Sequence, residues 1–348
     1  MINSGSRFPG TMRTHARGVT LVELMVALVL GLVVSGAALA LFMTNKQVYT
    51  SSENLDRIQE SSRTAFELMA RDLREADGNP CSSEITPVSN GLKSHTTYKW
   101  WSTWGAGATA NDAGAGLQGY TGTDPFPDPD GFGTAAGDRV EGTPAIEVWT
   151  ALPTDIVVTS AMAGTSADLT VNGTTGKGVA ANDMLVICDY NHGAIFQATS
   201  VGATTIGHAA SGTPGNTSAD LPPSVYGPDA SYADRFAYIS KMHASRWYVG
   251  YNGRQDRDGN MLTSLYRTSF DGTTLTPAPD EIVEGINGLT LSYHVRNGST
   301  YDEVPSSWRD VDAIKIGLNL AGRDKAGTDQ QTLKRDYEHV VAIRSRSP

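Results

Sequence analysis

The sequence contains few of the residues that build metal centres and hydrolytic active sites. Two cysteines are too few for a four-cysteine zinc site or for a small fold held together by many disulfides. The seven histidines stand singly along the chain, and neither the G-x-S-x-G nor the H-E-x-x-H motif occurs. The sequence therefore argues against an enzyme and predicts no cofactor and no metal site.

Positive charge is scarce as well. The chain has 27 basic and 37 acidic residues, which gives a formal net charge of −10. Nucleic-acid binding requires a clustered positive surface, so no nucleic-acid partner is expected, although Arg335, Arg344 and Arg346 could form a small basic patch. The 37 glycines follow no Gly-X-Y repeat, and they indicate the many turns of a β-rich fold.

One long apolar run stands near the N-terminus. Residues 19–43 carry a single charge, Glu23, and as a helix they would extend roughly 37 Å, enough to cross a bilayer. The residues before them contain Arg7, Arg13 and Arg17 and no acidic residue. Positive charge before a span favours an N-in, C-out orientation. We therefore expect a single-pass inner-membrane protein whose C-terminal domain lies in the periplasm.

Two simpler interpretations of this run are a cleaved secretory signal peptide and an ordinary signal anchor. A signal peptide has an apolar core of only about 7–15 residues, and neither interpretation accounts for Glu23. A carboxylate inside a membrane helix costs a few kcal/mol and by default has a function. The alternative is a carboxylate that snorkels to the membrane interface.

The residues at the start of the apolar run form a motif. They read Gly-Val-Thr-Leu-Val-Glu-Leu over residues 18–24 and resemble the type IV prepilin signature, with Val19 where phenylalanine is usual. The resemblance implies that prepilin peptidase cleaves between Gly18 and Val19 on the cytoplasmic side and that the new Val19 amine is methylated. It also assigns a role in assembly to three residues, Thr20, Leu21 and Glu23.

Removal of the leader changes the charge of the chain and gives Glu23 a partner. The three leader arginines leave with it, so the formal net charge moves from −10 to −13. When subunits stack, the Val19 amine of one chain can approach Glu23 of its neighbour. An ion pair in low dielectric is strongly favoured over an unpaired charge, and Glu23 would therefore set the register of the subunits.

The helix is predicted to continue beyond the membrane. Apolar residues recur after Phe42 in steps that are mostly three, four or seven. They are Val48, Leu55, Ile58, Ala65, Phe66, Met69, Leu73 and Ala76. Arg63 and Glu67 form an i,i+4 pair on the polar face. Residues 77–80, Asp-Gly-Asn-Pro, are typical of a helix end.

These boundaries divide the chain into four parts. They are a cleaved leader (1–18), a hydrophobic transmembrane and filament-core helix (19–44), an amphipathic continuation (45–78) and an exported globular β-rich domain (79–348). Within the last part, residues 81–144 are expected to be irregular and strands are expected from residue 145 onward. The expected strands are 146–149, 156–158, 184–188, 194–197, 246–251, 262–267, 289–295, 313–320 and 339–343.

The order of these elements predicts the fold class. Residues 246–251 and 262–267 flank a turn and are expected to form a hairpin. Alternation places Ile316, Leu318 and Leu320 on one face of their strand. Short strands after one long helix predict an α+β, pilin-like fold, in which a long N-terminal helix packs on an antiparallel sheet.

Two features of the expected irregular region each have two interpretations. Trp100, Trp101 and Trp104 either pack over the sheet or form an exposed contact with another subunit. An acidic, proline-rich run is either a turn-rich loop or a calcium site. The oxygen ligands of that site would be Asp124, Asp128 and Asp130.

Beyond the motif, the order of segments resembles the PilW-type minor pilins. The stretches that carry this resemblance are 183–189, 194–197, 247–250 and 281–286. It implies a subunit that joins other minor pilins and the major pilin, helps to initiate a type IV pilus, and sits at or near its tip with a PilC-class adhesin. It also implies a role in twitching motility and adhesion, with the mature chain moving from the inner membrane to the pilus.

Two other functions fit the same residues. Pseudopilins of type II secretion systems share the processing motif, and a pilus-tip module could bind a surface directly. The cysteines fit export in each case, because an oxidising periplasm permits a bridge between Cys81 and Cys188. Such a bridge would close a loop of roughly 100 residues, for which a chain-entropy model gives about 4.7 kcal/mol. Two free buried thiols are the alternative.

Overall fold

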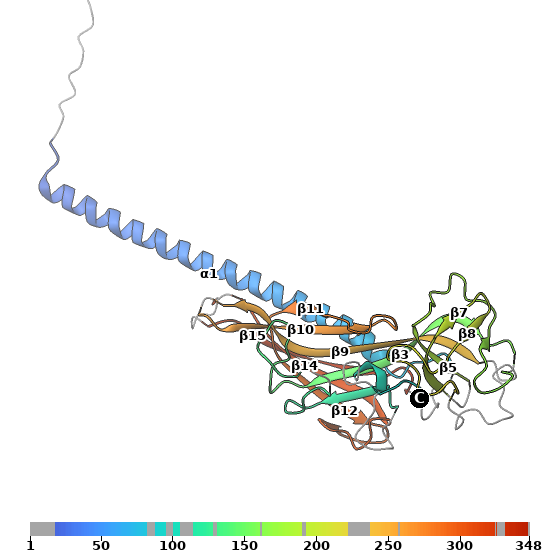
Figure 1. Cartoon of the computed structure of the whole chain (residues 1–348). Coiled ribbons are helices and arrows are strands. Elements are labelled where there is room, and N and C mark those ends of the chain that lie inside the picture. The colour runs from blue at the N-terminus through green and yellow to red at the C-terminus, as the bar shows by residue number, and fades with distance from the viewer. Residues whose placement is uncertain are drawn as a thin grey trace, which may run out of the picture. The chain divides into compact units, whose positions relative to one another are not determined.

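The computed structural model describes residues 18–81, 88–94, 100–104, 114–127, 131–160, 162–189, 193–221, 237–256, 258–323, 325 and 331–346. The leader arginines, Asp128 and Asp130 lie outside these residues. The chain divides into two compact units, Met1–Glu53 and Asn54–Pro348, and each is described by itself. Figure 1 labels α1 and many of the strands.

One long helix, α1 (Leu21–Arg74), runs through the first unit and into the second. In the second unit its apolar stripe is buried as predicted, and the buried residues include Ile58, Ala65, Met69 and Leu73. The polar face carries the predicted pair, in which Arg63 Nε lies 2.8 Å from Glu67 Oε1. A turn at residues 75–77 follows the helix.

The larger sheet of the second unit has eight strands. Its main path runs β1 (Val88–Asn90), β6 (Gly193–Gln197), β5 (Met184–Cys188), β9 (Tyr238–Gln255), β10 (Met261–Phe270) and β11 (Pro279–Glu284). Off this path, β3 (Ala145–Val157) pairs with β9 and with β2 (Leu117–Tyr120). The pairings are antiparallel except for β1 with β6. The predicted hairpin is confirmed as β9 and β10.

The second sheet has four antiparallel strands. Its order is β13 (Tyr301–Asp302), β12 (Ile286–Val295), β14 (Val311–Ala321) and β15 (Lys334–Ala342), with β12 between β13 and β14. The predicted alternation in β14 is confirmed, because Ile316, Leu318 and Leu320 are buried while the residues between them are partly exposed.

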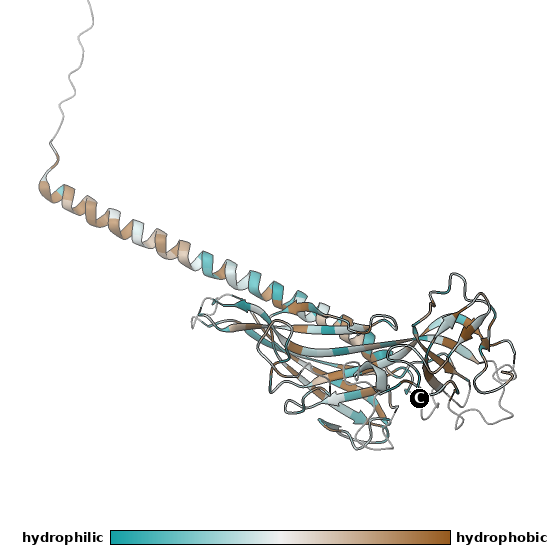
Figure 2. Cartoon of the chain, viewed as in Figure 1, coloured by the Kyte–Doolittle hydropathy of each residue, from teal (hydrophilic) through white to brown (hydrophobic). Residues whose placement is uncertain are grey.

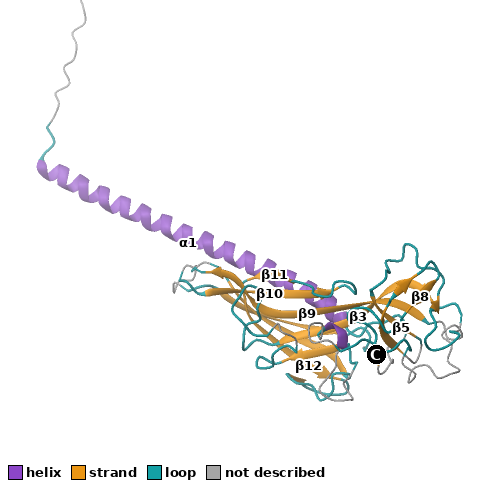
Figure 3. Cartoon of the chain, viewed as in Figure 1, coloured by secondary structure: helices purple, strands orange, loops and turns teal. Residues whose placement is uncertain are grey.

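A small lobe carries its own apolar cluster. A three-stranded sheet of β4 (Leu169–Thr170), β8 (Thr205–Gly207) and β7 (Ser200–Val201) lies in it. Side chains from this sheet pack with others from β5 and β6, among them Leu169, Ile206, Leu185 and Phe196. Figure 3 shows strands and loops alternating through this part of the domain.

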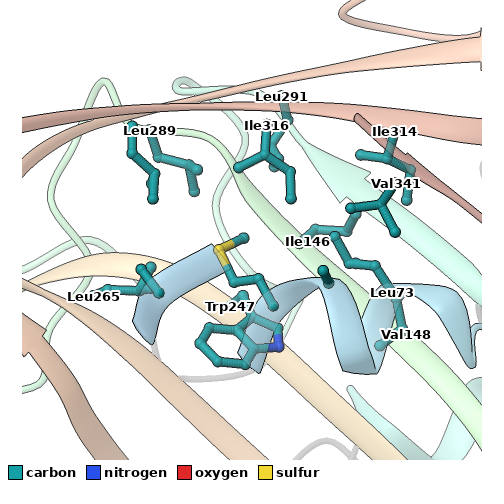
Figure 4. Close-up of a cluster of buried hydrophobic side chains, with 14 of the residues drawn as sticks. Leu73, Ile146, Val148, Trp247, Leu265, Leu289, Leu291, Ile314, Ile316 and Val341 are labelled. Carbon is teal, nitrogen blue, oxygen red and sulfur yellow. The ribbon is translucent and has the colours of Figure 1, made fainter. Parts of the chain in front are cut away.

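The main core forms where the second half of α1 lies between the two sheets. Figure 4 shows Leu73 with Ile146, Val148, Trp247 and Leu265 from the larger sheet. Residues of the four-stranded sheet pack from the opposite side; they are Leu289, Leu291, Ile314, Ile316 and Val341. This packing of one long helix on β-sheets confirms the predicted α+β, pilin-like fold.

Two expectations about the strands of the domain are corrected by the structure. The region 81–144 is not irregular throughout, because it holds β1, β2 and a short 3-10 helix, η1 (Trp101–Thr103). The strands expected at 146–149 and 156–158 are one strand, β3, interrupted by an irregularity between Pro153 and Ile156. Asp155 there has a φ of 58°, which lets the chain bend and resume pairing.

The three tryptophans are core residues, and their interpretation as an exposed subunit contact is wrong. Trp100, Trp101 and Trp104 are 4%, 0% and 1% exposed. Trp101 stacks on Phe270 with ring centroids 4.0 Å apart, and its indole nitrogen donates to the Leu275 carbonyl at 3.0 Å. These rings are buried because the segment that carries them folds back over the larger sheet.

The structure contradicts the suggested basic patch, and it places one of the suggested calcium ligands, Asp124, in a turn. Arg346 is 5% exposed, so a surface patch with Arg335 and Arg344 is wrong. The Asp124 carboxylate accepts hydrogen bonds from the Thr121 amide and hydroxyl, as in a turn. Within the described parts of the chain, no group of three or more His, Cys, Asp or Glu side chains could hold a metal ion.

The predicted disulfide is confirmed. Cys81 and Cys188 are bonded, with their Cα atoms 6.0 Å apart and a sequence separation of 107. Cys81 follows the end of the helix, and Cys188 is the last residue of β5. The bond therefore fastens the segment that leaves the helix to the larger sheet.

Candidate functional site

The N-terminal motif lies at the start of α1, and its threonine caps the helix. Gly18, Val19 and Thr20 precede the first helical residue. The Glu23 amide donates to Thr20 Oγ1 at 3.2 Å, and the Leu24 amide donates to the Thr20 carbonyl at 3.1 Å. Threonine at the N-cap with glutamate three residues later is the spacing of a capping box.

Glu23 stands in the first turn of the helix, among exposed apolar side chains. A carboxylate there is stabilised by the positive end of the helix dipole. Leu21, Val22 and Val26 around it are 75%, 69% and 53% exposed. Glu23 therefore combines a favourable position for negative charge with an apolar neighbourhood that gives the carboxylate little hydration once it is covered.

The first part of α1 is apolar on all sides. By length and composition the helix can cross a membrane, and none of its most apolar 18-residue window is buried in the described chain. Figure 2 shows the apolar colouring of this stretch. A helix that is hydrophobic all round is stable in a bilayer or in a core of other helices, so this segment requires one of these surroundings.

The comparison with known families agrees with this arrangement. Residues 13–39 match the family described as the prokaryotic N-terminal methylation motif, which supports a type IV prepilin-like protein. The motif indicates a type IV pilin-like or pseudopilin protein. No curated protein and no solved structure matches the chain.

The motif has direct consequences for the fate of the chain. It implies processing by prepilin peptidase and assembly with other pilins. Proteins that carry it are structural rather than enzymatic. The apolar helix and the motif together fit anchoring in the inner membrane, followed by assembly into a pilus.

At its other end the helix is held by the C-terminal segment of the chain. The Arg344 amide donates to the Arg74 carbonyl at 3.0 Å, and Ser345 Oγ donates to the Ala76 carbonyl at 2.8 Å. These carbonyls belong to the last turn of the helix and the turn after it, where acceptors otherwise lack partners. The C-terminal segment therefore caps the helix.

Beside this cap, the buried Arg346 pairs with Asp77, whose side chain is 16% exposed. Burial raises the pKa of Asp77, while the Arg346 guanidinium and the Trp104 indole oppose that rise. Burial also lowers the pKa of Arg346. Asp77 has a φ of 58°, so it ends the turn after the helix in the left-handed conformation that asparagine and aspartate tolerate best among non-glycine residues.

A second charged side chain of the helix ties it to the larger sheet. Asp72 Oδ2 accepts a hydrogen bond from the Trp247 indole at 2.9 Å and lies 2.9 Å from Arg267 Nε. Trp247 and Arg267 come from β9 and β10. The helix is thus attached to the hairpin by polar bonds as well as by apolar packing.

Deeper in the larger sheet, Glu147 and Arg246 form a buried ion pair at 2.6 Å, with side chains 1% and 2% exposed. Tyr120 donates to the other Glu147 oxygen at 2.8 Å. The Arg246 guanidinium also lies 3.8 Å from the Phe126 ring centroid and 4.7 Å from that of Trp100. The pair fastens loop aromatics to the sheet.

A second buried arginine extends this stack. Arg139 lies 4.8 Å from the ring centroids of both Phe126 and Phe132. Burial, with Arg246 nearby, lowers the pKa of Arg139 to about 10. Arginine suits such sites because its planar guanidinium stacks on aromatic faces. These contacts hold the segments around residues 126 and 132 in place.

Sequence reasoning found the motif and the disulfide, and it missed the polar networks. From the sequence, Asp77 could be identified only as part of the run that ends the helix, and Arg346 only as part of a suggested basic patch. The lone Glu147 within an apolar strand segment, Ala-Ile-Glu-Val-Trp, was the one signal of a buried charge. Nothing in the sequence identified Arg246 as its partner.

Proposed function

We propose that the protein is a minor pilin, of the PilW type, that helps to initiate a type IV pilus and stays at or near its tip. The observation that carries the proposal is a large domain on a single apolar helix that bears the prepilin motif. In this role the subunit works with other minor pilins, the major pilin and a tip adhesin, and supports twitching motility and adhesion.

The size of the domain supports a position at the end of a filament. A unit of about 300 residues (Asn54–Pro348) has a radius of gyration of about 19 Å and is roughly 50 Å across. Packed helices, in contrast, are about 8–10 Å apart. A head this wide is difficult to repeat along a core of closely packed helices, whereas a tip subunit has neighbours on one side only.

Glu23 is the proposed assembly residue, with Val19 as its partner. Cleavage between Gly18 and Val19 would create an amine at the start of the helix. When the apolar helices of two subunits pack together, that amine and a neighbour's Glu23 carboxylate can neutralise each other in low dielectric. Subunits in the wrong register would leave a charge unpaired, which costs several kcal/mol.

The test of this function uses Glu23→Ala, with Glu60→Ala as the matched control. Glu60 is an exposed glutamate of the same helix. We expect both variants to be processed, while only Glu23→Ala is missing from pili sheared from cells that lack the wild-type gene. Normal incorporation of Glu23→Ala would contradict the assembly role of this residue.

A pseudopilin of a type II secretion system is the second candidate, because the matched motif fits both systems. Deletion of the gene distinguishes them. A minor pilin predicts loss of surface pili and of twitching, whereas a pseudopilin predicts intact pili and a loss of exoprotein secretion. Neighbouring genes for a pilus adhesin or for a secretion channel would point in the same directions.

A further inference from the structure

The helix begins abruptly, and Thr20 sets the point at which it begins. Gly18, Val19 and Thr20 have no regular secondary structure, while Leu21 is helical. Thr20 Oγ1 accepts the Glu23 amide at 3.2 Å. Threonine is among the residues preferred at the N-cap, because its side-chain oxygen satisfies an amide that the helix itself leaves free.

Loss of this cap would move the start of the helix. The first amides of a helix need acceptors, and leaving them unpaired is strongly unfavourable where water is scarce. Fraying of the first turn is therefore costly next to a membrane. Extension towards the N-terminus is the alternative, since carbonyls upstream of Leu21 would then accept these amides. Such an extension would draw Gly18 and Val19 into the helix.

The conformation of Gly18 and Val19 matters for hydrolysis of the bond between them. Water adds across this amide, the leader leaves with the Gly18 carboxylate, and Val19 gains a free amine. Peptidases act preferentially on exposed backbone without stable secondary structure, so a helical bond would first have to unwind. Only Val19 stands between the bond and the capping residue.

We propose that Thr20 is a positioning residue for prepilin processing. Its cap starts the helix at Leu21 and thereby keeps the Gly18–Val19 bond in non-helical backbone, where the peptidase can reach it. The inference rests on the proposed cleavage between Gly18 and Val19. Thr20 acts through the start of the helix and contacts none of the reacting atoms.

The experiment measures cleavage of the full-length chain in lipid vesicles by prepilin peptidase. Thr20→Ser and Thr20→Asn keep a capping oxygen, while Thr20→Val keeps the shape of threonine and loses the cap. We expect kcat/KM within about threefold of wild type for the first two. For Thr20→Val we expect it about 5- to 30-fold lower, as follows from the usual loss of about 1–2 kcal/mol on removing a cap.

The matched control and a second measurement separate this role from general disruption. Thr44→Val makes the same change at a threonine further along the helix, whose hydroxyl donates to the Ala40 carbonyl, and it should leave cleavage unchanged. Hydrogen exchange of the uncleaved chains should show protection extending to residues 18–20 in Thr20→Val alone.

Three results would overturn the proposal. The first is cleavage of Thr20→Val as fast as that of wild type, and the second is an unchanged helix start in that variant. The third is a loss of cleavage in Thr20→Ser and Thr20→Asn as large as that in Thr20→Val, which would mean that the peptidase recognises the threonine side chain directly. A wild-type chain that is not cut between Gly18 and Val19, as judged by intact mass, would instead contradict the proposed processing itself.

Discussion

Arg346 Nη2 lies 3.3 Å from Asp77 Oδ2, across a sequence separation of 269 residues. The same guanidinium donates to the carbonyls of Trp308 and Val311 at 2.7 and 2.9 Å, and to that of Ala115. One buried arginine thus connects the turn after the helix with the start of β14 and with the segment that precedes β2. This connection makes the junction between helix and domain sensitive to single substitutions.

Replacement of Arg346 by Met should destabilise the domain by about 3 kcal/mol at pH 7, the lower end of the range for a buried pair, because the largely buried Asp77 carboxylate would lose its cation. Burial already raises the pKa of Asp77, and loss of Arg346 raises it further. A raised pKa means that stability is greatest when the carboxyl is protonated and is lost as pH rises through the folded-state pKa. The destabilisation should therefore be larger at pH 7 than near pH 4, as urea unfolding would show.

The double variant Asp77→Asn/Arg346→Met is the control for this prediction. It removes the charge that Arg346 compensates, so part of the stability at pH 7 should return and the added pH dependence should disappear. A pH-independent loss in Arg346→Met alone would contradict the role of the Asp77 charge.

Removal of the Cys81–Cys188 disulfide should lower the free energy of unfolding by about 2–5 kcal/mol. The bond closes a loop with a sequence separation of 107, so the unfolded chain gains considerable entropy without it. Thermal unfolding of Cys81→Ser/Cys188→Ser should show a lower Tm than wild type. Added reductant should lower the Tm of wild type and leave that of the double variant unchanged. If reductant lowered the Tm of both proteins equally, the disulfide would not be the cause of the difference in stability.

The two ion pairs Glu147–Arg246 and Arg63–Glu67 should respond very differently to truncation. The first is buried in the larger sheet and the second is exposed on the helix. Arg246→Met leaves a buried carboxylate unpaired and should cost about 3–5 kcal/mol, whereas Arg63→Met should leave stability unchanged within error, because exposed pairs contribute little. Denaturant midpoints of the two variants compare them directly, and similar losses would show that burial is not decisive here.

The sequence was sufficient to predict the elements in which hydrophobic periodicity dominates. The apolar stripe of α1, the β9–β10 hairpin and the alternation of Ile316, Leu318 and Leu320 in β14 all follow from residue spacing. These elements make up the helix and the centre of both sheets. The prepilin motif was equally readable, because its chemistry depends on neighbours in sequence.

Apart from the disulfide, the features that depend on residues far apart in sequence were not predictable. Burial of Trp100, Trp101 and Trp104 requires knowing that their segment folds over the larger sheet. Arg346 reads as part of a charged tail until its tertiary partners are known. Likewise β2 lies in a glycine-rich stretch, and its pairing with β3 outweighs its weak intrinsic propensity.

We propose that the mature chain is a processed pilin-like subunit of a surface filament. The most direct test is mass spectrometry of the protein in the filament fraction sheared from cells. We expect a chain that begins at N-methylated Val19 in that fraction. A chain that keeps its leader and is found only in the membrane, in cells with active prepilin peptidase, would contradict it.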